Sequence, residues 1–193
     1  KLARGQSRSA DAQYQLALAQ IRINELTDAL DQLRLALQIS PEHFAARTAL
    51  GSLQVRLGNT DAALDTAADV EQRFPDTHVG AAIRGDALLR AGDAGRAYAA
   101  YRSAFDTAPG SAMLLKLYAA QTRSGDPVGA RNLLDKWLTQ NPADAAVRLT
   151  IASLEHQQGQ LESATAAYKR VLESNPRSVM ALNNLAWIYA ETS

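Results

Sequence analysis

The chain has 193 residues, and its 20 basic and 20 acidic side chains give a formal net charge of zero. Because phosphate neutralisation needs a basic excess, this balance argues against nucleic acid as the main partner. The absence of cysteine excludes disulfides, cysteine-zinc sites and thiol nucleophiles, and no apolar run approaches the ~18 residues of a membrane-spanning helix.

Apolar residues recur at helical spacing along the chain, and no stretch alternates as a half-buried strand would. The pattern therefore predicts an all-α protein. Residues 1–9 precede the first helix, and we expect them to be the remnant of a preceding segment. The helices are predicted, in chain order, at 10–23, 26–39, 44–57, 60–73, 78–91, 94–107, 111–124, 127–140, 145–158, 161–174 and 179–191.

Four series of residues repeat in one register. Five prolines are spaced 34, 34, 33 and 34 residues apart: Pro41, Pro75, Pro109, Pro142 and Pro176. An alanine lies twelve residues before each of them, at Ala29, Ala63, Ala97, Ala130 and Ala164. A small residue recurs at Ala17, Gly51, Gly85, Ala119, Ala152 and Ala186. A turn residue recurs at Asn24, Gly58, Gly92, Gly125 and Gly159.

Each series has a physical reason. A small residue in one helix and an alanine in the next let two antiparallel backbones approach closely. Glycine or asparagine adopts the left-handed conformation that ends the first helix of a pair. Proline cannot continue a helix, so it marks the turn after the second helix. One repeat therefore reads helix, turn, helix and a turn marked by proline.

The register of Leu50-Gly51, Ala63 and Pro75 resembles the tetratricopeptide repeat, and the resemblance covers residues 10–193. It implies a right-handed superhelical solenoid of about five and a half repeats. The chain departs from the family at Gln20, Gln54 and Glu155, where a large residue is expected, and these repeats are predicted to pack more loosely. The repeats are predicted at 10–43, 44–77, 78–111, 112–144 and 145–178, with 179–193 as the first helix of a sixth.

The last predicted helix has no second helix to pair with in this sequence. Each repeat buries its apolar face against its neighbours, so we expect Leu182, Leu185 and Ile188 to lack cover. The predicted consequence is self-association through this helix, or fraying of its end.

A narrower resemblance lies in the segment Ala181-Leu182-Asn183-Asn184-Leu185-Ala186-Trp187-Ile188-Tyr189. It is similar to the C-terminal part of a bacterial tetratricopeptide lipoprotein family associated with PEP-CTERM/exosortase systems and exopolysaccharide loci. That resemblance implies a periplasmic or envelope-associated protein and a scaffolding role in surface polymer or protein export. Without it, a cytoplasmic location stays open.

No group of residues in the sequence assembles a catalytic or metal site. His43, His78 and His156 lie in different repeats, without the spacing of a metalloprotease pair, and are expected to be surface or inter-repeat residues. No phosphate-binding glycine loop and no serine nucleophile motif occurs. We therefore expect neither an enzyme nor a cofactor.

Candidate partner-binding residues lie on the first helix of each repeat, which lines the concave surface in the family that the chain resembles. The positions that correspond to it are Tyr14, Ser52, Asp86 and Ser153. An arginine precedes four turns by two residues, at Arg22, Arg56, Arg90 and Arg123. A row of these arginines could bind acidic side chains, a chain terminus or an acidic glycan. Alternatively, each cation only stabilises the C-terminal end of its own helix.

The two tryptophans differ in their predicted roles. Trp137 is expected to fill space between repeats. Trp187 falls at a concave position, where it either stacks on a partner or a sugar ring, or packs into a following repeat.

The leading hypothesis is a non-enzymatic scaffold whose concave surface holds a peptide or helix of a partner protein. The alternative is an export-pathway component whose groove contacts an acidic polysaccharide directly. Arginines together with an accessible tryptophan or tyrosine in the groove favour the polysaccharide, and an apolar groove favours the peptide.

Overall fold

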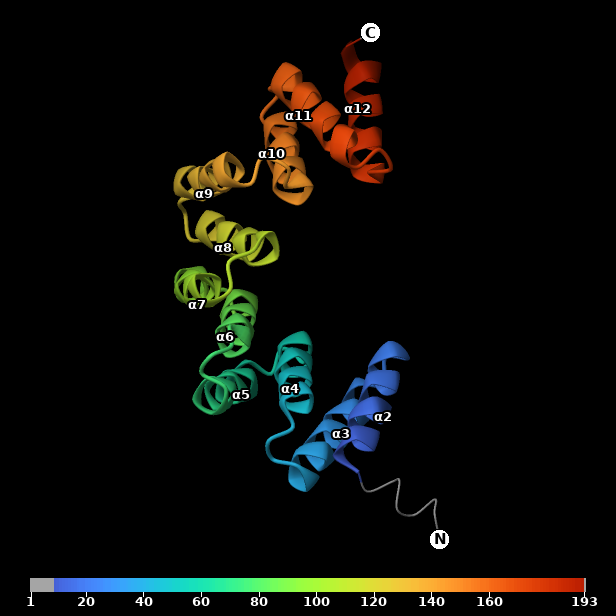
Figure 1. Cartoon of the computed structure of the whole chain (residues 1–193), viewed down its shortest axis with the longest axis vertical. Helices are drawn as coiled ribbons and strands as arrows, with labels where there is room; N and C mark the ends of the chain where they lie inside the picture. The colour runs from blue at the N-terminus through green and yellow to red at the C-terminus, as the bar shows by residue number, and fades with distance from the viewer. Residues whose placement is uncertain (1–8, 193) are drawn as a thin grey trace. The chain divides into compact units, whose positions relative to one another are not determined.

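The computed structural model describes residues 9–192, whose helices are labelled in Figure 1. They divide into two compact units between Pro109 and Gly110. The first unit contains α2 (Ala10–Arg22), α3 (Leu26–Ile39), α4 (Phe44–Leu57), α5 (Thr60–Arg73), α6 (Val79–Arg90) and α7 (Ala94–Thr107). The second contains α8 (Ser111–Arg123), α9 (Pro127–Gln140), α10 (Ala145–Gln157), α11 (Leu161–Ser174) and α12 (Val179–Thr192).

Every predicted helix is present, and each end lies within one residue of its predicted position. Residues 9–192 contain no strand, so the predicted all-α fold is confirmed. Within each unit, consecutive helices pack in pairs, and the second helix of a pair also packs on the first helix of the next. The first helices are α2, α4, α6, α8, α10 and α12, and the others are second helices.

The turn inside each pair has the predicted left-handed backbone. The φ angles are 64° at Asn24, 79° at Gly58, 86° at Gly92, 97° at Gly125 and 72° at Gly159. Within residues 9–192, Asn24 is the one residue other than glycine with a positive φ. Glycine and asparagine tolerate this region best, which explains why they alone fill the series.

Side-chain caps begin several helices. The Asp93 carboxylate accepts a hydrogen bond from the Arg96 amide, and the Asp144 carboxylate accepts from the Ala146 and Val147 amides. Such bonds satisfy amides that have no partner within the helix. They define where α7 and α10 begin.

The alanines of the predicted series lie where the two helices of each pair contact each other. All five are 0% exposed, because each lies against the first helix of its own pair. In the third pair the contact is especially close: a Cβ atom added to Gly85 would come to 2.5 Å from Cδ1 of Tyr101. The small residue is thus required by the neighbouring ring.

The fourth pair corrects one prediction. Ala119 was expected to continue the small-residue series, but it lies six residues before the turn residue Gly125, where the other pairs have seven. Tyr118 lies seven residues before Gly125, as Gly85 lies before Gly92, so Tyr118 holds that place. The missing residue of this repeat therefore falls between Pro109 and Tyr118, and a large side chain stands where the other pairs have a small one.

Two of the polar residues that depart from the tetratricopeptide pattern form hydrogen bonds with side chains of neighbouring helices. Gln54 is 5% exposed, and its Oε1 atom accepts a hydrogen bond of 2.7 Å from the Thr66 hydroxyl. Glu155 accepts a hydrogen bond of 3.0 Å from Nη2 of Arg131, which reaches it from α9. At these positions a polar pair takes the place of a large apolar side chain.

Helix α12 is better covered than predicted. Leu182 is 47% exposed, as expected, but the prediction is wrong for Leu185 and Ile188, which are 7% and 2% exposed. Both join Tyr168 and Val171 of α11 in one apolar cluster. The face toward the preceding pair is therefore buried, and only the remaining faces of α12 carry exposed apolar residues.

Candidate functional site

Three of the four predicted arginines lie in the first unit, at the ends of α2, α4 and α6, and all three are exposed. Nη2 of Arg56 donates a hydrogen bond of 2.8 Å to Oδ1 of Asn24, the turn residue of the preceding pair. Similarly, Nε of Arg90 lies 3.5 Å from the point where a Cβ atom of Gly58 would stand. Arg56 and Arg90 thus extend along the turn of the preceding pair.

The contact with Asn24 adds a packing role for Arg56 to the two interpretations of the arginine series. That contact uses one of the five N–H donors of the Arg56 guanidinium, and the residue is exposed. Arg123 is also exposed, but it ends α8 in the second unit. The structure therefore groups Arg22, Arg56 and Arg90 in one unit and places Arg123 in the other.

The predicted surface residues of the first unit have three different environments. The half-buried Tyr14 ring lies 5.3 Å from the His43 ring, whose Nε2 atom lies 3.0 Å from Oδ1 of Asp11. Asp86 accepts a hydrogen bond of 2.6 Å from the Tyr101 hydroxyl. Ser52 is exposed. His43 is therefore an inter-repeat residue, as predicted, and it also caps α4 by accepting from the Ala46 amide.

In the second unit, Ser153 takes part in a comparable contact. Its Oγ atom lies 3.4 Å from the hydroxyl of the fully buried Tyr168, which also accepts a hydrogen bond of 2.9 Å from Asn184. Asp86 and Ser153 occupy equivalent positions, one residue after the small residue of their helices. Each is held by a tyrosine from the second helix of its own pair, so both serve the packing of that pair.

Trp187 occupies the same position in α12, but its side chain is 51% exposed. Its ring lies 4.8 Å from the His156 ring at an interplanar angle of 51°. Beside the two rings is a hollow of about 440 Å³. The side chains that line it come from α10, α11, α12 and the turn between α10 and α11: His156, Gln157, Gly159, Leu161, Trp187 and Glu191.

Sequence reasoning did not identify His156, Leu161 or Glu191 as members of a surface site. A signal for the His156 contact was available in the repeat spacing. His156 and Trp187 are 31 residues apart, close to the 32 residues that separate Asn24 from Arg56. A separation slightly shorter than one repeat thus brings residues of successive first helices together.

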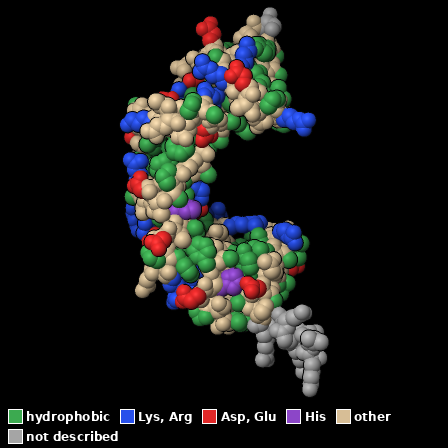
Figure 2. All heavy atoms as spheres, in the orientation of Figure 1, with side chains coloured by type: hydrophobic (Ala, Val, Ile, Leu, Met, Phe, Trp, Pro, Cys, Tyr) green, Lys and Arg blue, Asp and Glu red, His purple; other side chains and the backbone are tan. Residues whose placement is uncertain are grey.

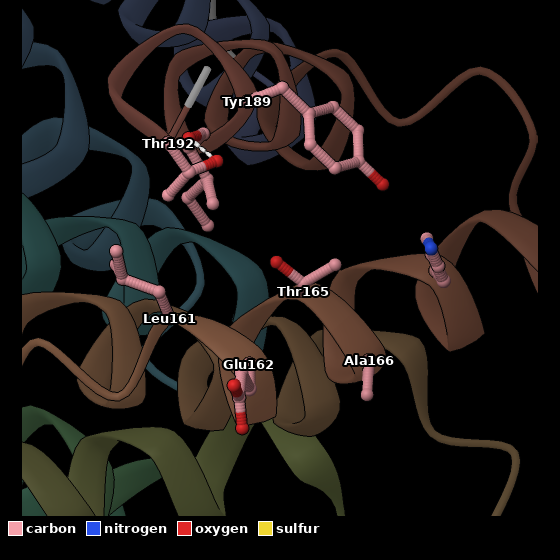
Figure 3. Close-up of a pocket in the computed structure, with 8 residues that line it drawn as sticks. Leu161, Glu162, Thr165, Ala166, Tyr189 and Thr192 are labelled. Carbon is pink, nitrogen blue, oxygen red and sulfur yellow. Dashed lines mark hydrogen bonds between the residues drawn. The ribbon is translucent and has the colours of Figure 1, made fainter.

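A second hollow, of about 500 Å³, lies between α11 and α12 (Figure 3). The Tyr189 ring projects from α12 over α11, where Thr165 and Ala166 line the opposite side. Nζ of Lys169 lies 5.9 Å from the centre of the Tyr189 ring. The hollow lies on an exposed side of α12, where Tyr189 is 46% exposed.

Trp137 has a structural contact. Its Nε1–H group donates a hydrogen bond of 2.7 Å to Oδ2 of Asp144, the residue that caps α10. The ring is half-buried and joins α9 to the start of the next helix, in agreement with a role in packing between repeats.

Charges on the surface are mixed and partly paired. Figure 2 shows basic and acidic side chains on each unit in the face that it presents. In the second unit, burial opposes the charge of Arg131, but hydrogen bonds with Glu155 and Asp135 outweigh it and raise the pKa of Arg131. In the first unit, burial, followed by the nearby charge of Arg73, lowers the pKa of Arg47. Both networks join neighbouring helices.

The described part of the chain contains no group of three or more histidine, aspartate or glutamate residues placed to hold a metal ion. Between residues 9 and 192, no helix is long and apolar enough to cross a membrane. The features that stand out are therefore surfaces: the arginines of the first unit and the hollow beside Trp187.

Comparison with solved structures shows the same architecture in other proteins. TTC0263 of Thermus thermophilus, a thermophilic TPR protein, superposes with a TM-score of 0.68 at 20% identity, covering 94% of this chain and 100% of its own. Yeast Tom70 gives 0.74 at 18% identity, covering 96% of this chain and 40% of Tom70. Pseudomonas aeruginosa pilF gives 0.70 at 21% identity, covering 97% and 87%.

A curated relative, the Arabidopsis thaliana protein CTR9 homolog, is 30% identical over 157 residues. The match covers 73% of this chain but only 14% of the plant protein. The sequence model of the tetratricopeptide repeat matches residues 24–84 and 121–192, which is more than half of the chain. Together with the repeated helix pairs and their left-handed turns, this match shows that the chain belongs to the tetratricopeptide repeat family.

Proposed function

We propose that this chain is a non-enzymatic scaffold that binds a peptide or helix of a partner protein on the surface of its first helices. The observation that carries the proposal is Trp187, which leaves 51% of its side chain exposed next to a hollow of about 440 Å³. Binding pockets have volumes of roughly 300–1,000 Å³, so the hollow is large enough to take a side chain of a partner.

Position and chemistry distinguish Trp187 from its equivalents. Asp86 and Ser153 are engaged by tyrosines of their own pairs, whereas Trp187 presents an apolar ring to solvent. Tryptophan is enriched among the residues that contribute most to protein interfaces, because its large rigid surface is buried at low entropic cost. An exposed tryptophan supported by His156 therefore suits partner binding.

The first unit would contribute polar contacts. Arg22, Arg56 and Arg90 are exposed at the ends of its three first helices, and Ser52 is exposed on α4. Guanidinium groups bind carboxylates through paired hydrogen bonds. We propose that acidic side chains or a chain terminus of the partner bind there, with Arg123 making a similar contact from the second unit.

We also propose that the chain works in the bacterial envelope, in the periplasm or at a membrane surface, as part of an exopolysaccharide or protein-sorting export system. Support comes from the segment 181–189, which is similar to the PEP-CTERM-associated lipoproteins. Fractionation of source cells with an antibody against this chain tests the location. Recovery of the protein in the cytoplasmic fraction alone would exclude it.

Direct contact with an acidic polysaccharide is the second candidate. Exposed arginines and an exposed tryptophan favour it, because tryptophan stacks on sugar rings and arginine binds carboxylates. However, the hollow beside Trp187 is lined by Glu191 and by no arginine or lysine. A carboxylate there repels an acidic glycan, so the observations favour a polypeptide.

The test is capture of partners from an envelope extract, followed by identification and by binding of the purified partner. Three variants are compared with the parent chain: Trp187→Ala, the fourfold change of Arg22, Arg56, Arg90 and Arg123 to Ala, and Val128→Ala. Val128 is 72% exposed on the second helix α9, so its variant is the matched control for loss of an exposed apolar side chain.

We expect the purified partner to bind the parent and the Val128 variant and to bind Trp187→Ala at least tenfold more weakly. Equal binding to all variants would overturn the assignment of this surface. Retention of an acidic glycan, with no polypeptide bound, would replace the proposal with the polysaccharide candidate.

A further inference from the structure

The wall of the hollow beside Trp187 carries one sign of charge. Of its six lining residues, Glu191 is acidic, none is lysine or arginine, and the others are uncharged or histidine. Within residues 9–192, Glu191 takes part in no hydrogen bond or ion pair of its side chain. The nearby Glu155, by contrast, is paired with Arg131 at 3.0 Å. Glu191 is therefore the carboxylate that this hollow offers to an external cation.

The aromatic and apolar parts of the wall suit the rest of a basic side chain. Among aromatic side chains, tryptophan attracts cations best. The Trp187 ring is supported on one part by its contact with the His156 ring. Leu161 supplies an apolar surface on the α11 side of the hollow. Lysine and arginine pack their methylene stems on such surfaces while the charged end reaches polar groups.

The same unit already contains an example of this contact. On another side of α12, Nζ of Lys169 lies 5.9 Å from the centre of the Tyr189 ring. That distance is within the ~6 Å over which an ammonium group is attracted to an aromatic face. Trp187 offers a comparable ring with a carboxylate nearby, but no lysine or arginine of residues 9–192 lies over it.

We propose that the hollow between α10, α11 and α12 binds a lysine or arginine side chain of the partner polypeptide, held between the Trp187 ring and the Glu191 carboxylate. The inference rests on the proposed scaffold function and specifies the chemistry of one contact. It predicts that the partner carries a basic residue at the segment that lies on the second unit.

The test uses small probes with the whole chain, so that it does not depend on knowing the partner. N-acetyl-lysine amide and N-acetyl-arginine amide are titrated against the protein, and the indole N–H signal of Trp187 is followed by NMR. N-acetyl-norleucine amide has the same stem without the charge. Trp187→Phe assigns the signal, Glu191→Gln removes the charge of the hollow, and Glu173→Gln, an exposed acid of α11, is the matched control.

We expect the lysine and arginine probes to shift the Trp187 signal, with an affinity about three- to tenfold higher than that of the norleucine probe. Glu191→Gln should weaken the basic probes about two- to fivefold, and Glu173→Gln should leave them unchanged. Equal binding of norleucine, or insensitivity to Glu191→Gln, overturns the inference.

A shift of the Trp187 signal by glucuronic acid, with none by lysine, also overturns it. These outcomes are separate from the scaffold proposal. If the purified partner still needs Trp187 but not Glu191, the scaffold stands and the basic contact fails. If the partner needs neither residue, the scaffold assignment to this surface fails as well.

Discussion

Gly85 occupies a position where no side chain fits. A Cβ atom there would come to 2.5 Å from both Cδ1 and Cε1 of Tyr101. The Tyr101 ring is 1% exposed and its hydroxyl is bonded to Asp86, so the ring has little freedom to move aside. We predict that Gly85→Ala lowers the free energy of unfolding by about 1–3 kcal/mol, measured by urea denaturation.

Gly95 is the matched control for this change. It lies in the first turn of α7, where an added Cβ atom would meet nothing within 4 Å. Gly95→Ala should therefore raise the free energy of unfolding by about 0.4–1 kcal/mol, because alanine has less freedom to lose. Equal effects of the two substitutions would contradict the close packing of α6 on α7.

The buried pair of Thr66 and Gln54 permits a second prediction at this scale. Thr66→Val removes the donor of the 2.7 Å hydrogen bond and leaves Oε1 of Gln54 without it. The expected loss of stability is about 1–3 kcal/mol. Adding Gln54→Leu should recover part of it, because the unsatisfied acceptor is then gone. A double variant less stable than the sum of the two single changes predicts would contradict this account. The hydrogen bond between Thr66 and Gln54 would then not explain why these polar side chains are buried here.

At the scale of one helix, Asp126 controls the start of α9. Its carboxylate accepts hydrogen bonds from the Gly129 amide and from Gln121, and these bonds, in that order of importance, lower the pKa of Asp126. Because the pKa is lower in the folded chain than in the unfolded one, the carboxylate contributes stability above the unfolded pKa. That contribution is lost as the pH falls through the folded pKa.

We therefore predict that stability falls on acidification below about pH 4 and that Asp126→Asn weakens this dependence. Asparagine caps a helix without titrating, so its contribution persists in acid. Titration of the Asp126 carboxyl group by NMR gives the same test directly. A pKa at or above the ordinary value of aspartate would contradict the assigned cap.

Helix α12 exposes apolar side chains on the faces that do not contact α11. Val179, Met180 and Leu182 are 67%, 58% and 47% exposed. We predict that the chain self-associates through them, and that Leu182→Glu shifts the equilibrium toward the monomer. Light scattering over a range of concentrations measures this. Val128→Glu, at an isolated exposed residue of α9, should have no effect, and a monomeric parent at every concentration would refute the prediction.

The helices and turns were predictable because the sequence features that determine them are local. Left-handed turns require glycine or asparagine, as at Gly58 and Asn24, and alanine at 0% exposure follows from the close approach of two helices. In the fourth pair the local signal was ambiguous. Ala119 keeps the spacing from the preceding repeats, whereas Tyr118 keeps the spacing to Gly125. The left-handed turn at Gly125 shows that Tyr118 holds the equivalent place.

The candidate site was less predictable, because side-chain direction is set by neighbouring helices. Sequence reasoning selected Trp187 and the arginines, but it could not know that Arg56 bonds to Asn24 or that Asp86 and Ser153 are held by tyrosines. It also missed Glu191, whose significance depends on the hollow formed by three helices. Turns require particular residue types, whereas side-chain contacts between repeats place only weak requirements on the sequence.

At the scale of the whole chain, each unit has its own core. One apolar cluster of the first unit joins Ala17, Leu33 and Leu50 from α2, α3 and α4. One of the second unit joins Tyr168 and Ile188 from α11 and α12. Repeat proteins distribute binding over several such units, since each repeat contributes a few residues to an extended surface. The central proposal is that the first helices of each unit bind a partner polypeptide.

The most direct test places a photoreactive phenylalanine derivative at Ser52 in the first unit, at Trp187 in the second, and at Lys136 as a control. Lys136 is exposed on the second helix α9. We predict that one partner polypeptide is cross-linked from Ser52 and from Trp187 in an envelope extract, and not from Lys136. Cross-linking of that polypeptide from Lys136 alone would contradict the claim that the first helices bind it.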